Sequence, residues 1–130
     1  MPHFQVEIAR ELDPEEEVAL LDAVHGALVE AFEIPERDRH GRLLVHAPHR
    51  LVHPPSATPE LTTLVTVDCF AGRSLEAKRR LYEAVVRRLE KLGVPGNHVS
   101  ILLRESRLEN WGVRGGRAAC DVDLDFTVEV

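Results

Sequence analysis

The sequence predicts an α/β (α+β) fold in which two tandem βαβ units form one four-stranded mixed sheet, with two helices packed on one face. Two observations carry this prediction. A strand-like alternation followed by a helical pattern occurs twice, the second copy about 61 positions after the first. A last segment follows neither copy, and it is typical of a C-terminal hairpin or strand.

Length and composition indicate a single domain over residues 1–130, with a pseudo-repeat at 2–47 and 62–104 and a C-terminal extension at 105–130. The net charge of -6 argues against a nucleic-acid or anionic-membrane partner. No apolar run is long enough to span a membrane, and no signal-peptide pattern is present. Cys69 and Cys120 lack CxxC or zinc spacing, so we expect reduced thiols in a cytoplasmic protein.

The first unit opens with a strand at "HFQVEIA" (residues 3–9), where apolar and polar residues alternate. A helix follows, because Asp13 can cap it, Pro14 suits its first position and Glu16 completes a capping box. Its apolar stripe is expected at Val18, Leu21, His25, Leu28 and Phe32. Pro35 cannot continue the helix, and "RLLVH" reads as a short strand.

A proline-rich connection, "APHRLVHPPSATPE" (47–60), separates the units and is expected to be a loop, with or without a short edge strand. The second unit repeats the pattern: a strand at "LTTLVTVDCF", a turn at "AGRS" with Ser74 as the N-cap, and a helix ended by Gly93 and Pro95. "VSILLRE" is its second strand.

The tail differs from both units. Gly115 and Gly116 indicate a hairpin. The segment "DVDLDFTVEV" (121–130) then alternates throughout, with apolar residues at every even position and Asp125 among its polar ones. An exposed strand with a fully apolar face invites aggregation. It is therefore expected to dock on another subunit of an oligomer or to pair within its own sheet.

Pro2 is the first candidate for chemistry. If Met1 is removed, the Pro2 nitrogen becomes a secondary amine, and burial in an apolar site would lower its pKa toward neutrality. Such an amine can act as a base, or as a proton donor if it stays charged. If Met1 is retained, that nitrogen is an amide without basicity. The simpler alternative is that Pro2 only starts a strand.

Arg73 stands just before the cap of the second helix, where a guanidinium can grip a carboxylate in bidentate fashion; a solvated turn arginine is the alternative. Asp38 follows the first helix and could place a water or relay a proton, unless it is a surface carboxylate. Trp111 and Phe126 could form an apolar wall or simply belong to the core. The neighbouring histidines (His46, His49 and His53) are separated by prolines, so no metal site is expected.

Taken together, "MP" before a strand, "LLDAVHGALVEAFEIPERDR", "AGRSLEAKRRLY" and "ENWGVRGGRAA" resemble the tautomerase superfamily, and within it the group of malonate semialdehyde decarboxylase-like tautomerases. The resemblance implies a catalytic N-terminal proline at Pro2, the acidic residue at Asp38, the arginine at Arg73 and the wall tryptophan at Trp111. It also implies a homotrimer whose C-terminal strands reach across interfaces, and no cofactor.

One departure from the family pattern matters. The decarboxylases of this group carry a second arginine two residues before the one matched here, and this chain has Ala71 at that position. Arg39, Arg114 or Arg117 could replace it, and spacing does not choose among them.

The sequence thus predicts a cofactor-independent enzyme acting on a small carboxylate with an oxo or enol group. Catalysis is assigned to Pro2, Asp38 and Arg73, and substrate binding to Arg73, Trp111, Phe126 and Arg39. Keto–enol tautomerisation is the first reading. The alternatives are decarboxylation or hydration of a 3-oxo acid such as malonate semialdehyde, and a non-catalytic trimeric binding or scaffold protein.

Overall fold

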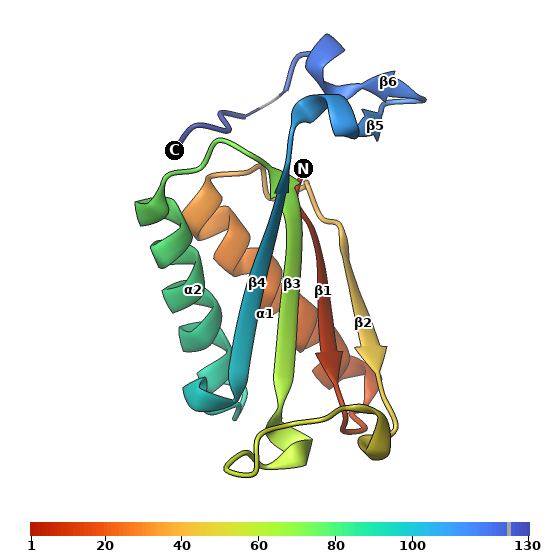
Figure 1. Ribbon diagram of the computed structural model, residues 1–130, viewed down its shortest axis with the longest axis vertical. Helices are drawn as coiled ribbons and strands as arrows, with labels where there is room; N and C mark the ends of the chain where they lie inside the picture. Colours follow the sequence, from red (N-terminus) through yellow and green to blue (C-terminus); the bar gives the residue numbers. More distant parts are fainter. Residues whose placement is uncertain (125) are drawn as a thin grey trace.

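The computed structural model describes residues 1–124 and 126–130, and Figure 1 shows one mixed sheet with strand order β2-β1-β3-β4. The strands are β1 (His3–Ile8), β2 (Gly41–Val45), β3 (Thr63–Phe70) and β4 (Val99–Ser106). β1 and β2 are parallel, as are β3 and β4, while β1 and β3 are antiparallel. The predicted pair of βαβ units and the mixed sheet are confirmed.

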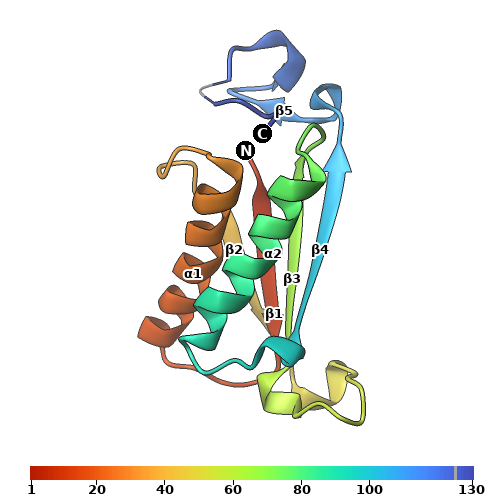
Figure 2. The same ribbon diagram turned by 90° about the vertical axis from the view of Figure 1, so that its left-hand side faces the viewer.

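Helices α1 (Pro14–Phe32) and α2 (Leu75–Glu90) cover the same face of the sheet, as Figure 2 shows. The core lies between these two layers. The alternating residues of β1 and β3 point into it and are at most 3% exposed: Phe4, Val6, Ile8, Val65, Val67 and Cys69. Small residues let the helices approach each other and the sheet, since Ala27, Ala31, Ala77 and Ala84 are fully buried. No helix among the described residues is both long and apolar enough to cross a membrane.

The start of α1 has the predicted capping box. The Asp13 carboxylate accepts from the Glu16 backbone N–H at 2.8 Å, and the Glu16 carboxylate accepts from the Asp13 N–H at 3.3 Å. The predicted apolar stripe was partly wrong, because Val18 is 56% exposed. The buried face instead runs through Leu20, Val24, His25, Ala27, Leu28, Ala31 and Phe32. Ala27 and Ala31, which the predicted stripe left out, belong to this buried face. The face begins at Leu20 and not at Val18.

The connection between the units contains no strand. It forms two single 3₁₀ turns, Pro48–Arg50 and Pro59–Leu61, each with a proline at its start. Ser74 caps α2 as predicted, its hydroxyl accepting from the Ala77 N–H at 3.1 Å. After α2, Gly93 has a φ of 90°, which favours glycine at this point of the chain.

The predicted hairpin is present as β5 (Gly112–Val113) and β6 (Arg117–Ala118), joined by Arg114, Gly115 and Gly116, all with positive φ. The predicted strand at 121–130 is wrong for the described residues 121–124 and 126–130; Asp125 lies outside them. The alternation itself is real, because Val122, Leu124, Phe126, Val128 and Val130 are half-buried while their described polar neighbours are exposed. These side chains pack on the chain's own core instead of on a strand. The Val130 carbonyl accepts from the Ser74 N–H at 3.0 Å.

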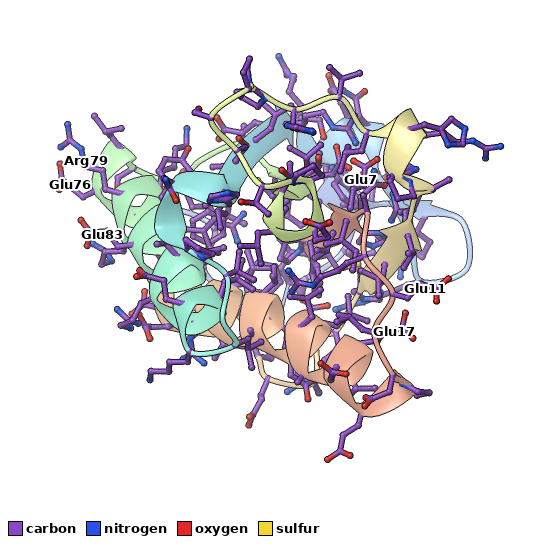
Figure 3. The ribbon with its side chains drawn as sticks, turned by 90° about the horizontal axis from the view of Figure 1, so that it is seen from below. Glu7, Glu11, Glu17, Glu76, Arg79 and Glu83 are labelled. Atoms are coloured by element: carbon purple, nitrogen blue, oxygen red, sulfur yellow. The ribbon has the colours of Figure 1, made fainter. Side chains whose placement is uncertain are left out.

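We expect Asp13→Ala to lower the free energy of unfolding by about 1 kcal/mol, because two backbone hydrogen bonds at the start of α1 depend on the capping box. Urea unfolding followed by circular dichroism measures the change. Glu11→Ala is the matched control, since Figure 3 shows Glu11 projecting into solvent at the same end of the molecule. Equal stability of the two variants would contradict the assigned role of the capping box.

Candidate active site

The candidate residues gather at one edge of the sheet, where β1 and β2 begin and β3 and β4 end. Figure 1 shows the N-terminus at this edge, beneath the C-terminal segment. The register explains why. His3 pairs with Asp68, so Pro2 lies beside the end of β3, and Phe4 pairs with Gly41, so the residues before β2 lie beside the start of β1. The loops that carry Asp38 and Arg73 therefore flank the start of the chain.

A cavity of about 240 Å³ opens at this edge. Its walls combine charged side chains with apolar ones: Met1, Pro35, Arg37, Asp38, Val113, Arg114, Leu124 and Phe126. They come from the loop after α1, from the hairpin and from the tail. Two arginines beside a carboxylate, with apolar walls around them, suit a small anionic molecule.

The N-terminal amine lies in this cavity and belongs to Met1, with Pro2 buried behind it. Its nitrogen is 3.3 Å from Oδ2 of Asp38. Burial lowers the pKa of this amine from 8.0 to about 6, although Asp38 acts in the opposite direction. The amine is therefore mostly neutral at pH 7 and can accept a proton.

Arg73 is a buried cation, 5% exposed. One Nη1–H donates to the Phe70 carbonyl at 3.2 Å, and the guanidinium lies over the Phe32 and Phe126 rings, 4.6 and 5.8 Å from their centroids. Its Nε and Nη2 have no hydrogen-bond partner among the described residues. Burial lowers the pKa of Arg73, but a guanidinium stays charged at neutral pH. Arg73 thus brings a buried charge with unused donors to this edge of the sheet, but it is not among the residues that line the cavity.

Arg73 and the amine belong to one electrostatic environment. The Arg73 charge contributes to lowering the pKa of the amine, while Asp38 favours the charged form of both groups. Cys69 is close enough to act on the pKa of both groups. It is fully buried, and burial raises the pKa of its thiol. The thiol is therefore protonated at neutral pH and is a poor nucleophile.

Trp111 and Phe126 both contact the Phe70 ring, Trp111 edge-on at a centroid distance of 5.0 Å and Phe126 stacked at 6.5 Å. The indole N–H of Trp111 donates to Ser106 Oγ at 2.7 Å. Phe126 lines the cavity, whereas Trp111 faces a separate depression on the helix-free side of the sheet, together with His3 and Arg42. The structure thus brings Phe126 to Asp38 and the amine, whereas Trp111 lies outside the cavity and contacts Phe70 and His3.

Arg39 is not brought to the cavity. Its guanidinium pairs with Asp22 of α1 and lines a different surface depression. Arg117 donates to the Asp121 carbonyl at 3.3 Å and is also absent from the cavity walls. Of the three arginines considered as replacements at the Ala71 departure, Arg114 alone lines the cavity.

Sequence reasoning missed two residues at this edge. Arg37 lines the cavity, and its only signal was its place beside Asp38. His40 Nε2 lies 3.1 Å from Asp38 Oδ1, and no periodicity points to that contact. The parallel pairing of β1 with β2 places residues 38–40 beside the chain start. Among residues 1–124 and 126–130, no three His, Cys, Asp or Glu side chains form a group suited to a metal ion.

A family model described as "tautomerase enzyme" matches residues 38–114, more than half of the chain. The chain belongs to the tautomerase family. This tautomerase is similar to the FG41 malonate semialdehyde decarboxylase inhibited by 3-bromopropiolate: 30% sequence identity, a TM-score of 0.81, and coverage of 89% of this chain and 92% of that one. The comparison with curated proteins gave no match.

Two further structures resemble the tautomerase closely. A malonate semialdehyde decarboxylase, studied for its decarboxylase and hydratase activities, is 28% identical over 89% of this chain and 93% of that one, with a TM-score of 0.81. A fused 4-OT that forms a symmetric trimer is 28% identical over 90% and 95% of the two chains, with a TM-score of 0.77. Within the family, these similarities support the malonate semialdehyde decarboxylase-like group.

We expect Arg73→Met to leave the free energy of unfolding unchanged or to raise it by about 1 kcal/mol, because an apolar side chain of similar length removes a buried charge with unused donors. Arg73→Ala is the matched comparison, and it should be less stable than Arg73→Met because it opens a cavity beside Phe32. Chemical denaturation measures both. A large loss of stability in Arg73→Met would mean that the charge holds the fold together.

Proposed function

We propose that this tautomerase catalyses keto–enol tautomerisation of a small oxo or enol carboxylate, with Pro2 as the acid/base once Met1 has been removed. The observation that carries the proposal is the amine at the chain start, whose pKa is lowered to about 6 inside a cavity that also holds Asp38. Met1 lines that cavity, so its removal would open the cavity to the Pro2 nitrogen. A neutral secondary amine there would be a base near pH 7.

The reaction needs one proton to move. The neutral Pro2 nitrogen takes the proton of the enol hydroxyl, and the electron pair left on oxygen forms the carbonyl. The electrons of the carbon–carbon double bond then take a proton from the charged prolyl nitrogen, which returns Pro2 to its neutral form. No external reductant or oxidant is required. Asp38 would stabilise the charged intermediate state of the amine, as its effect on the pKa of the terminal amine supports.

Arg73 would hold the substrate carboxylate. A bidentate carboxylate satisfies a guanidinium better than a single carbonyl does, and Arg73 has one bond to a carbonyl and two buried nitrogens without a partner among the described residues. Phe126 lies over the guanidinium and also lines the cavity, so we propose that it moves aside or forms the wall against the substrate. Arg114 would supply a second cation on the cavity wall, and Trp111 would support the aromatic wall through Phe70.

Decarboxylation or hydration of a 3-oxo acid such as malonate semialdehyde is the second candidate. The observation favouring it is the similarity to two malonate semialdehyde decarboxylases, at 30% and 28% identity. That chemistry uses a charged Pro2 and a water placed by Asp38. Ala71 in place of the second arginine favours tautomerisation over it.

Intact-mass spectrometry of the purified protein should show loss of Met1. Pro2→Ala should then reduce kcat/KM for the enol of phenylpyruvate by about 100-fold or more, since the base would become a more mobile and less well placed primary amine. Malonate semialdehyde, assayed in parallel, separates the second candidate from the first. Retention of Met1 in the mature protein would rule out the proline mechanism and favour the third reading, a non-catalytic binding or scaffold protein.

We also propose that the protein is a homotrimer, as the fused 4-OT relative is. The helix-free face of the sheet, which carries the exposed apolar residue Leu102 (59% exposed), would be covered on assembly. Sedimentation velocity should give the mass of a trimer, and Leu102→Lys should shift it toward monomer. A wild-type protein that sediments as a monomer at all concentrations would contradict this proposal.

A further inference from the structure

Asp38 is held at both carboxylate oxygens. Oδ2 faces the N-terminal amine at 3.3 Å, and Oδ1 faces His40 Nε2 at 3.1 Å. The carboxylate is mostly buried, with 13% of its side chain exposed, so few water molecules can hold it in other orientations. The contact of His40 with Asp38 is an ion pair by distance, and a carboxylate oxygen can only accept, so it favours the form of His40 that carries a proton on Nε2.

His40 is fixed on two further sides. Its carbonyl accepts from the Phe4 N–H at 2.9 Å, which ties it to the strand that begins next to Pro2. Its ring stacks on the His3 ring, with centroids 4.6 Å apart and planes 14° apart. The His3 ring in turn meets the edge of Trp111 at 5.2 Å. A continuous series of contacts therefore runs from Trp111 through His3 and His40 to the carboxylate.

His3 is the neutral imidazole of the His3–His40 stack. Burial above all, and then His40 and Arg42, lower the pKa of His3. His3 is thus mostly neutral at neutral pH, and its ring stacks on the His40 ring that faces Asp38. Without the His40 donor the carboxylate could rotate about its Cβ–Cγ bond, and Oδ2 would no longer be held toward the amine.

We propose that His40 is a positioning residue that orients the Asp38 carboxylate toward the N-terminal amine, with His3 as the support of its ring. This inference rests on the proposed function, since the orientation matters only if the amine transfers protons. His40 does not line the cavity and lies on the far side of Asp38, so it acts through that carboxylate and not on the substrate. Its loss should therefore affect turnover and not substrate affinity.

The test compares full-length variants with matched chemistry. His40→Phe keeps a ring for stacking and removes the donor, and we expect kcat for the enol substrate to fall about tenfold while KM stays within about twofold. His40→Gln places an N–H near the position of Nε2 and should restore most of kcat. His46→Phe is the control, because His46 Nε2 also faces a carboxylate, in a hydrogen bond of 2.9 Å with Glu7, at the other end of β2.

The outcomes separate clearly. Unchanged kcat in His40→Phe, equal losses in His40→Phe and His40→Gln, or a change in KM alone would each overturn the proposal. Thermal unfolding of every variant shows whether a loss of kcat follows a loss of folding.

If the wild-type protein turns over no enol, the proposed function fails, and a second measurement still tests the contact. Nitrogen-15 spectra of the histidine rings should show the His40 proton on Nε2, and Asp38→Asn should alter the His40 signals and leave those of His46 unchanged; a His40 spectrum indifferent to Asp38→Asn would overturn the contact itself.

Discussion

The antiparallel pairing of β1 with β3 is the constraint on which the rest of the structure depends. It joins the two βαβ units through their first strands, and its register places His3 opposite Asp68. Because β1 starts where β3 ends, the chain start meets the loop that leads into α2. The parallel partners of these strands bring the loop before β2 and the segment after β4 to the same edge. The antiparallel pairing and the two parallel ones built on it thus bring four distant parts of the sequence to a single edge.

The two units share a topology, but the loops at this edge differ in chemistry. The first unit contributes a carboxylate and a histidine in "ERDRHG", and the second contributes a buried guanidinium in "AGRS". A repeat unit supplies a scaffold that tolerates different loops, because the alternating core residues of β1 and β3 carry the packing in both units. The two halves of the chain therefore differ in the chemistry of their loops at this edge, although they share a topology.

Local patterns in the sequence were sufficient for most of the fold. The capping box at Asp13, the N-cap at Ser74 and the alternation in β1 and β3 depend on neighbours within a few residues, and the structure confirms all of them. The strand expected at 121–130 was wrong, because alternation reports which side chains are buried and cannot report whether a partner strand exists. The proximity of Asp38 to the terminal amine and the separation of Arg39 from the cavity depend on tertiary geometry, for which the sequence carries no local signal.

Burial opposes the charged form of the terminal amine, of Arg73 and of Cys69 at this edge. It lowers the pKa of the amine and of Arg73 and raises that of the Cys69 thiol. The amine and the thiol can respond by becoming neutral, whereas the guanidinium cannot at physiological pH. If Arg73 binds the substrate as proposed, the apolar edge selects by charge. A carboxylate would then gain a partner for which water does not compete, while a neutral ketone of the same shape would leave the Arg73 Nε and Nη2 donors unused.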